Sequence, residues 1–393
     1  MNRLSVVLLL APCFLVQALG ISGCGKGATK PGAAPATGGA SSEIRVIAKA
    51  LSEGEPEEVT ALLRTDKLLF VGTKHGLRVF TFDAATRKLE PAADVPLTEP
   101  AVQKYPVNAL RADGSKVHVC TTDGLATWNG KSWDSESMGP VLDVVNYGGA
   151  LWIARSRGLE KKGGKEWREE KIPGLTVNPG SSQRVKSLAL MPDGKQEPNQ
   201  EQKYRLWVGS EFGIYSFNNA DKKWSPQIYG EYLNVQGDMV MPEKGNSDLC
   251  GNDVNRLIAD ADAGKLLICT QTGLSVFDGK DQWKMYQGDY ETHTAETGLK
   301  TRAKKKGNVE LPSPSVTCAM LQGSAVWIGM SEGLARVDGD KIQLWDTNSD
   351  LPSSAVHALA HDPANGVLFV GTERGLAVLA PVPAGAPAEA AKK

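Results

Sequence analysis

The segment Gly329-Met330-Ser331-Glu332-Gly333 matches G-x-S-x-G, the pattern that places a nucleophilic serine at a sharp strand-to-helix turn in many hydrolases. The surrounding residues read VWIGMSEGLARV and predict a strand on each side of the pattern, with no helix after it. Because a nucleophile elbow needs that helix, we predict that Ser331 is a turn residue and not a nucleophile.

Other patterns that could bind a phosphate or a metal ion are better explained as turns and strands. Residues 130–132 read Gly-Lys-Ser, as at the end of a P-loop, but position 125 is a leucine where that motif needs glycine. His357 and His361 are four residues apart, about 13 Å along a strand, which is too far to share one metal ion. The segment DADAG (260–264) lacks the spaced acidic ligands of a calcium loop. We therefore predict no catalytic residue, no metal ion and no cofactor.

The segment around Ser331 is one of seven similar copies along the chain. The copies are LFVGTKHGLRVF (69–80), VHVCTTDGLATW (117–128), LWIARSRGLEKK (151–162), LWVGSEFGIYSF (206–217), LLICTQTGLSVF (266–277), VWIGMSEGLARV (326–337) and LFVGTERGLAVL (368–379). Serine and threonine hydroxyls can bond to the backbone of a turn, and we expect that role for Ser331. Its expected equivalents are Thr73, Thr121, Arg155, Ser210, Thr270 and Thr372.

Each copy has the same flanking elements, so the repeating unit is longer than the motif. A β-like run precedes it, and a polar turn follows, in most copies with a tryptophan: Trp133, Trp167, Trp224, Trp283 and Trp345. The expected unit is a four-stranded antiparallel meander of about 40–50 residues, the size of a propeller blade. The seventh unit lacks its fourth strand, while the β-like segment 42–50 is left over ahead of the first. We predict an all-β, seven-bladed β-propeller, closed by that N-terminal strand pairing with the last blade.

Copies such as LWVGSEFG and VWIGMSEGL, each followed by a polar turn and an aromatic residue, resemble the two-component regulator propeller repeat. The resemblance covers roughly residues 42–380. It implies a seven-bladed propeller of the kind often found in the periplasmic sensor regions of hybrid histidine kinases. No transmembrane helix or kinase module follows the repeats in this sequence, so we do not expect this polypeptide itself to signal.

The N-terminal region has the features of a bacterial export signal. Arg3 is followed by apolar residues without a charge until Lys26, and Ile21-Ser22-Gly23-Cys24 resembles a lipobox, whose cysteine receives lipid. A signal cleaved without lipidation and an uncleaved anchor are the alternatives. We expect an exported, membrane-anchored lipoprotein, more in keeping with the outer membrane because Gly25 is not the aspartate of inner-membrane retention. The expected segments are a signal peptide at 1–23, a flexible tether at 24–41 that begins with the lipidated Cys24, the propeller at 42–380 and a disordered tail at 381–393.

Four further cysteines fall in the predicted propeller, and an exported protein can form disulfides. Cys120, Cys269 and Cys318 lie inside predicted strands, where a buried free thiol is expected. Cys250 lies in a loop and is the cysteine for which a disulfide is expected. No CxxC pair is present among them, which argues against zinc.

Two connections between consecutive units are much longer than the others, at 225–253 and 285–315. Long loops on a rigid scaffold commonly carry binding function, and tyrosine and arginine are common in interfaces. The candidate partner-binding residues in these loops are Tyr229, Tyr232, Tyr286, Tyr290, His293, Arg302, Lys304 and Lys305. The alternative is that both loops are solvated insertions without a binding role.

Charge and composition narrow the classes of function. The 393 residues carry 44 Lys+Arg against 45 Asp+Glu, which is not the balance of a nucleic-acid binder. We expect a non-enzymatic, lipid-anchored envelope protein whose propeller binds a protein partner or a small ligand, as a scaffold or sensory accessory. The alternative is a propeller hydrolase or lyase with its site at the channel mouth, for which the innermost strands offer Asn108, Asp143, Asn255, Arg256 and His357.

Overall fold

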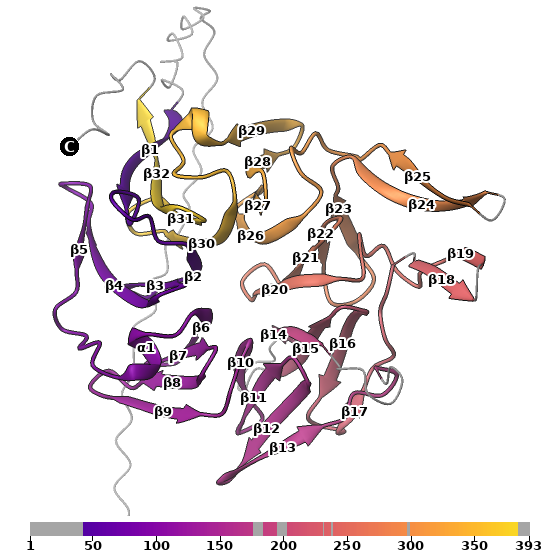
Figure 1. Ribbon diagram of the computed structural model, residues 1–393, viewed down its shortest axis with the longest axis horizontal. Helices are drawn as coiled ribbons and strands as arrows, with labels where there is room; N and C mark the ends of the chain where they lie inside the picture. The colour runs from indigo at the N-terminus through magenta and orange to yellow at the C-terminus, as the bar shows by residue number, and fades with distance from the viewer. Residues whose placement is uncertain are drawn as a thin grey trace, which may run out of the picture. The chain divides into compact units, whose positions relative to one another are not determined.

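The computed structural model describes residues 42–175, 184–194, 203–230, 232–236, 239–296 and 299–383. This part of the chain forms seven four-stranded antiparallel sheets and two separate two-stranded hairpins. Figure 1 shows the seven sheets arranged around a central axis as the blades of a propeller. The predicted all-β, seven-bladed propeller is confirmed.

In blades 1 to 6 the four strands follow one another in the sequence, with the first strand nearest the axis and the fourth at the rim (Figure 1). Blade 1 contains β2 (Val59–Arg64), β3 (Leu69–Thr73), β4 (Gly76–Asp83) and β5 (Lys88–Pro91); blade 2 contains β6 (Val107–Asp113), β7 (Lys116–Thr121), β8 (Gly124–Trp128) and β9 (Trp133–Ser137). Blade 3 contains β10 (Asp143–Tyr147), β11 (Ala150–Arg155), β12 (Gly158–Gly163) and β13 (Glu166–Glu170); blade 4 contains β14 (Val185–Pro192), β15 (Tyr204–Ser210), β16 (Gly213–Asn218) and β17 (Lys223–Trp224).

The remaining blades repeat this order, and two short helical turns connect strands near the rim. Blade 5 contains β20 (Val254–Asp260), β21 (Lys265–Thr270), β22 (Gly273–Phe277) and β23 (Trp283–Tyr286); blade 6 contains β26 (Val316–Gln322), β27 (Ala325–Met330), β28 (Gly333–Asp338) and β29 (Lys341–Trp345). The two turns are α1 (Pro100–Gln103) and the 3-10 helix η1 (Thr347–Ser349). Within the described ranges, no helix combines the length and apolar content that a membrane crossing needs.

Blade 7 is built from both ends of the repeat region. Its strands β30 (Val356–Asp362), β31 (Val367–Thr372) and β32 (Gly375–Pro383) are joined by β1 (Ser42–Ala50), which pairs antiparallel with β32. The pairing runs from Ser42 opposite Pro383 to Ala50 opposite Leu376. The predicted ring closure is confirmed, and it covers an edge of β32 that would otherwise be unpaired. The last strand continues past residue 380, to Pro383.

The small residue near the end of each second strand explains how closely the blades pack. In four blades it is glycine, and a Cβ atom placed there would lie 2.5–2.8 Å from the Cγ1 atom of the first valine of the next blade. The four pairs are Gly72 with Val107, Gly209 with Val254, Gly329 with Val356, and Gly371 with Val59. The other three blades carry Cys120, Ala154 and Cys269 at this place. The repeated V/I-G of the motif is thus a packing requirement, since tightly packed cores tolerate little added volume.

The tryptophans of the fourth strands pack on their own blade and also contact a neighbouring one, as when Trp167 of blade 3 donates its indole N–H to Glu136 of blade 2 at 2.8 Å. Trp283 stacks on Phe277 with ring centroids 4.2 Å apart. Trp345 of blade 6 donates its indole N–H to the carbonyl of Ile44 in blade 7, at 3.3 Å. These rings therefore close the outer part of the blade interfaces, while the strands near the axis close the inner part.

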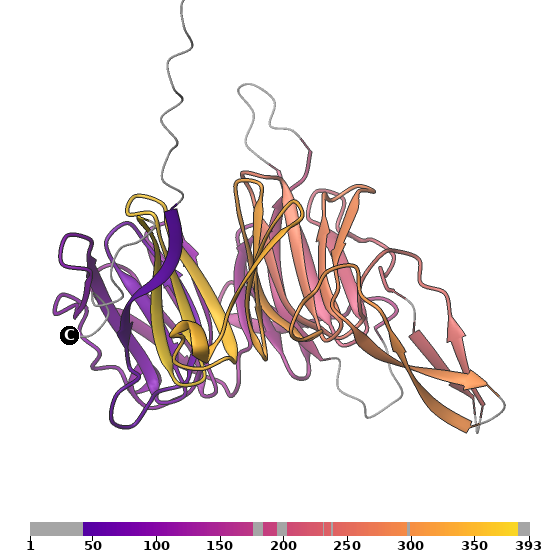
Figure 2. The same cartoon turned by 90° about the horizontal axis from the view of Figure 1, so that it is seen from above.

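The two long connections contain β-hairpins where the sequence predicted loops. β18 (Tyr232–Gln236) pairs with β19 (Met239–Glu243), and β24 (Tyr290–Glu296) pairs with β25 (Leu299–Lys305). Figures 1 and 2 show both hairpins extending from the same side of the ring. β19 and β24 lie next to each other. We call residues 232–243 and 290–305 together the hairpin arm.

Candidate functional site: the central channel and the hairpin necks

The innermost strands of the seven blades surround a channel of about 990 Å³. Six of these strands have a register shift directly after their first valine, as between Val59 and Ala61 in β2. Such a bulge re-aims a side chain, and here the bulged residue lines the channel. Leu142, just ahead of β10, occupies the corresponding place in blade 3. The seven residues are Thr60, Asn108, Leu142, Lys186, Asn255, Thr317 and His357.

Most of these bulged residues bond to the next blade around the ring. Four of them donate a side-chain hydrogen bond to the backbone carbonyl of a valine at the start of the next innermost strand. The bonds run from Thr60 to Val107 (2.5 Å), from Asn108 to Val141 (2.8 Å), from Asn255 to Val316 (2.7 Å) and from Thr317 to Val356. Lys186 contacts Asp253 of blade 5, and His357 lies 3.9 Å from Glu58 of blade 1. These polar residues line the channel as the residues of a binding site would, but their observed contacts join neighbouring blades.

Asp143, which the hydrolase alternative would need as an acid or base, is a buried link between blades. Its carboxylate accepts two hydrogen bonds from Arg111 of blade 2, at 2.7 and 2.6 Å. It also accepts bonds from the Ser187 hydroxyl at 2.9 Å and from the Leu188 amide at 2.8 Å, both in blade 4. Burial by itself would raise the pKa of Asp143, but the Arg111 charge and these hydrogen bonds hold that pKa below its ordinary value. The ionised carboxylate is fully engaged by donors and joins three blades.

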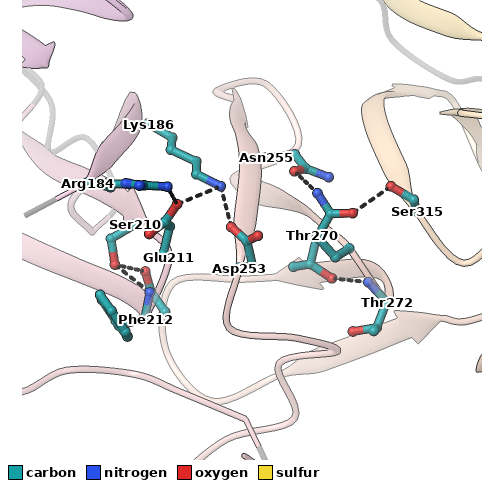
Figure 3. Close-up of polar contacts among 12 residues, drawn as sticks. Arg184, Lys186, Ser210, Glu211, Phe212, Asp253, Asn255, Thr270, Thr272 and Ser315 are labelled. Atoms are coloured by element: carbon teal, nitrogen blue, oxygen red, sulfur yellow. Dashed lines mark hydrogen bonds and ion pairs between the residues drawn. The ribbon is translucent and has the colours of Figure 1, made fainter. Parts of the chain in front are cut away.

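At the channel mouth between blades 4, 5 and 6, polar side chains also pair with one another (Figure 3). The contacts are Lys186 with Glu211 (3.7 Å) and with Asp253, and Gln271 with Asn255 (2.7 Å) and Ser315 (3.0 Å). Figure 3 shows Lys186 and Asn255 on neighbouring innermost strands, and Glu211, Asp253 and Ser315 in the adjoining turns and connections. At the mouth, charged and amide side chains thus pair with one another, and these contacts hold blades 4, 5 and 6 in place.

Ser331 lies in a two-residue turn between two strands, as predicted, but its expected alignment is wrong by one position. Thr73 pairs with Gly76 across its turn, and in blade 6 the residue that pairs with Gly333 is Met330. The equivalent of Thr73 is therefore Met330, a buried side chain. Five blades do have a hydroxyl at the Thr73 position, which donates to the carbonyl of the turn glycine at 2.8–3.1 Å. Ser331 instead shares a 2.8 Å hydrogen bond with the hydroxyl of Ser313.

The two hairpins are attached to the ring by the same asparagine clamp. In the first, the backbone N–H of Tyr229 donates to Asn246 Oδ1 (2.9 Å), and the backbone N–H of Asn246 donates to the Tyr229 carbonyl (3.0 Å). The side-chain Nδ2 of Asn246 donates to the Gln227 carbonyl (2.8 Å). In the second, Gln287 and Asn308 make the corresponding pair at 2.8 and 2.9 Å. Asn308 Nδ2 likewise donates to the carbonyl of Met285, two residues before Gln287, at 2.9 Å. Each clamp satisfies the backbone groups where the insertion leaves the blade.

The predicted partner-binding residues divide between the hairpin arm, its necks and a blade core. Tyr229 is half-buried at the first neck, and Tyr290 is half-buried at the start of β24. Tyr286 is 4% exposed in the core between blades 5 and 6, so the structure assigns it to packing and not to an interface. Lys304 is exposed and faces Glu291 in the strand register, and Lys305 faces Tyr290. For Tyr232 on β18 and for His293 and Arg302, which face each other in the register of β24 and β25, only the backbone is described.

The cysteines of the described region are all free thiols. Cys120, Cys269 and Cys318 are buried, in agreement with expectation. Cys250 is also free, in contrast to the expected disulfide, and its thiol donates to the Leu274 carbonyl at 3.4 Å. Burial raises the pKa of Cys250 to about 11. The lipidation residue Cys24, the signal segment and the tether lie outside the described residues, as do residues 384–393 of the predicted tail.

Sequence reasoning missed two groups of residues that organise this region. Arg111 and Ser187, which hold Asp143, have partners 32 and 44 positions away, and no local pattern marks such pairs. The clamp asparagines Asn246 and Asn308 stand near the ends of both long connections, but nothing local distinguishes them from other polar loop residues. The available signal was weaker: a polar residue follows the first valine of the innermost strand in six of the seven units.

No family model and no curated protein matches the sequence. Solved structures with a similar fold include the extracellular domains of the putative hybrid two component systems BT4673 and BT3049 from B. thetaiotaomicron. They are 15% and 16% identical over 86% of this chain, with TM-scores of 0.56 and 0.51, and the chain spans only 39% and 41% of their lengths. The computationally designed Ika8 protein aligns over 86% of this chain and 100% of its own, at 14% identity and a TM-score of 0.50. At such identities the likeness shows the fold alone.

Proposed function

We propose that this chain is a non-enzymatic propeller of the bacterial cell envelope that holds a protein partner through its hairpin arm. The observation that carries the proposal is the matched construction of the arm. Two hairpins are inserted at consecutive blade junctions, lie next to each other, and are each clamped by one asparagine in the same way. An isolated hairpin is marginally stable in water, so a paired and clamped arm on a rigid ring is suited to a binding role.

The composition of the arm indicates the kind of surface that it fits. Within 290–306 there are five Lys or Arg residues against two Glu, whereas 232–243 has two acidic residues and no basic one. The first hairpin also contains five aliphatic or methionine residues among its twelve. The proposed partner is therefore a folded protein whose surface combines an apolar patch with acidic groups.

The location in the envelope rests on the N-terminal sequence. Residues 1–24 have the charge, apolar run and terminal cysteine of a lipoprotein signal, and the similar solved structures are described as extracellular domains. We place a lipid anchor on Cys24 and a flexible tether from there to residue 41, with the outer membrane as the anchoring membrane. One acyl chain alone anchors weakly, and the diacylated cysteine of a lipoprotein supplies the two chains that stable anchoring needs.

The channel residues give the hydrolase alternative little support. Asn108, Asp143, Asn255 and His357 each contact a neighbouring blade, and the one acid among them is neutralised by Arg111. An enzyme of this kind needs an acid or base that is free to exchange a proton with a substrate.

The test is removal of the arm with both necks left in place. Residues 231–244 and 289–306 are replaced by short Gly-Ser linkers in the full-length protein, and partners are captured by crosslinking in intact cells. We expect the specific crosslinked partner to be lost while the ring retains its β-sheet circular dichroism and its melting temperature. The control removes residues 195–202, which connect β14 and β15. Identical crosslinked partners with and without the arm would refute the proposal.

The anchor is tested separately by Cys24→Ser. We expect labelled palmitate to enter the wild-type protein and not the variant, and the variant to leave the membrane fraction. Equal membrane association of both proteins, with no lipid label in either, would show that the N-terminal segment is not a lipoprotein signal.

A further inference from the structure

Arg256 differs from the residues at the same place in the other innermost strands. The residue directly after the channel-lining one is buried in the other six blades: Ala61, Ala109, Asp143, Ser187, Cys318 and Ala358. In blade 5 it is an arginine, only half-buried, that lines the channel. Its Nη2 atom reaches the carbonyl of Thr60 in blade 1, at 3.4 Å. This long hydrogen bond is the only one that the described residues offer to a side chain with five N–H donors.

The charges that line the channel leave Arg256 without a counter-ion. The two lining acids are already paired, Asp143 with Arg111 at 2.6 Å and Glu58 with Lys74 at 3.4 Å. A third lining base, Lys186, pairs with acids of the channel mouth. Within the described part of the chain no carboxylate forms an ion pair with Arg256. The channel therefore carries one unneutralised positive charge in a partly enclosed, low-dielectric space.

The Arg256 charge also acts on titratable residues of the neighbouring blades that border the channel. Burial raises the pKa of Cys318 in blade 6 to about 11, and the Arg256 charge works against this rise. Burial lowers the pKa of His357 in blade 7, and the Arg256 charge lowers it further, while Glu58 and Glu373 oppose the change. Together with the contact to Thr60, Arg256 of blade 5 is close to blades 6, 7 and 1.

We propose that the channel binds a small organic monocarboxylate, held by the guanidinium group of Arg256. The planar guanidinium fork matches the two oxygens of a carboxylate, and charge-assisted hydrogen bonds of this kind are the strong ones. A single negative charge compensates the single surplus positive charge, whereas a phosphate dianion would face the carboxylate of Glu58 with one charge left over. Leu62, Ile258, Met320 and Leu359 line the same channel and favour a short apolar body on the ligand.

The test compares carboxylates with amides of the same shape. Butyrate and benzoate, and their neutral counterparts butyramide and benzamide, are titrated into the purified wild-type protein and followed by ligand-observed NMR and calorimetry. We expect saturable binding of at least one carboxylate. Its amide should bind with an affinity lower by about tenfold or more, because hydrogen bonds to a charged group are stronger than neutral ones. Inorganic phosphate is the competing anion and is expected to bind less tightly than the carboxylate.

Variants of Arg256 assign the binding to the channel. Arg256→Gln is expected to weaken carboxylate binding by about tenfold or more, and Arg256→Lys to weaken it less, since a lysine keeps the charge without the fork. Arg168→Gln, which changes an exposed arginine of β13, is the matched control and should bind as the wild type does. Melting temperatures establish that each variant folds, and if Arg256→Gln does not fold, the comparison of Arg256→Lys with wild type decides.

Several results would overturn the proposal. They are the absence of carboxylate binding to the wild type, equal binding of acid and amide, phosphate binding more tightly than the carboxylate, or full binding by a folded Arg256→Gln. If the wild type binds no carboxylate, or if a folded Arg256→Gln binds fully, the role left for Arg256 is the contact that braces blade 5 against blade 1. Removing the hairpin arm should leave carboxylate binding unchanged, so this proposal and the proposed function can fail independently.

Discussion

Arg64 in blade 1 and Asp362 in blade 7 stand 298 positions apart in the sequence and form a buried ion pair, with 2.8 Å between Nη2 and Oδ2. The Arg64 Nε–H group donates a second bond to the same oxygen at 2.9 Å. Only 10% and 3% of the two side chains are exposed. This pair lies near the axis, while β1 completes blade 7 at the rim. The first and last blades are thus joined both near the axis, by this ion pair, and at the rim, by β1.

We expect Asp362→Ala to destabilise the protein strongly. It leaves the Arg64 guanidinium buried without its partner, and breaking a buried ion pair in this way costs about 3–5 kcal/mol. Glu166→Ala is the matched control, because it breaks the exposed pair with Arg168 and should cost at most about 1 kcal/mol. Urea unfolding of the two variants measures the difference. Similar midpoints for both would mean that the Arg64–Asp362 pair does not secure the ring.

The link at Asp143 predicts a specific dependence of stability on pH. Because the folded-state pKa of Asp143 lies below its unfolded value of about 3.9, its contribution is present above that value and is lost as the pH falls through the folded-state pKa. Between pH 7 and pH 3, the unfolding free energy of the wild type should therefore fall more steeply than that of Asp143→Asn. Parallel curves for the two proteins would show that the carboxylate is not selectively stabilised in the fold.

The close approach of neighbouring blades is tested at Gly371. A Cβ atom there would lie 2.5 Å from Val59 Cγ1, and overpacking of this kind costs about 1–3 kcal/mol. Gly371→Ala should lower the melting temperature, and the double variant with Val59→Ala should lose less than the sum of the single changes. Gly163→Ala, in a strand where no atom lies within 4 Å of the new Cβ, is the control. Additive effects at Gly371 and Val59 would disprove the contact.

The asparagine clamps should hold the hairpins without stabilising the ring. Asn308→Ala removes the partner of the Gln287 amide and the donor to the residue 285 carbonyl, so the second hairpin should detach at its base. We expect limited proteolysis within 288–307 to become several-fold faster, with the melting temperature of the ring unchanged. Asn129→Ala, which removes a similar turn asparagine in blade 2, should leave that cleavage unaffected. An unchanged cleavage rate in Asn308→Ala would mean that the clamp does not restrain the arm.

The blade count, the strand order and the closure of the ring follow from the sequence by itself. Pairing within a blade joins strands that are neighbours in the chain, so a strand–turn–strand motif repeated seven times reports it directly. The segment 42–50 had no place except the missing strand of the seventh unit, and it does pair with β32. The small residue of each second strand was also visible as part of the motif, although its reason, the valine of the next blade, was not.

The functional geometry was decided by the tertiary structure. Contacts between blades join residues tens to hundreds of positions apart, and the local sequence repeat carries no information on them. The bonds from Arg111 and Ser187 to Asp143 could therefore not be anticipated. A bulge in the innermost strands changes which side chain enters the channel, and that choice depends on the neighbouring blades. Packing between blades 5 and 6 placed Tyr286 in a core, although its sequence context suggested a surface loop. Blade-to-blade packing acts over long sequence separations, so only the tertiary structure distinguishes the residues that hold the ring together from the hairpin arm and Arg256, for which we propose binding roles.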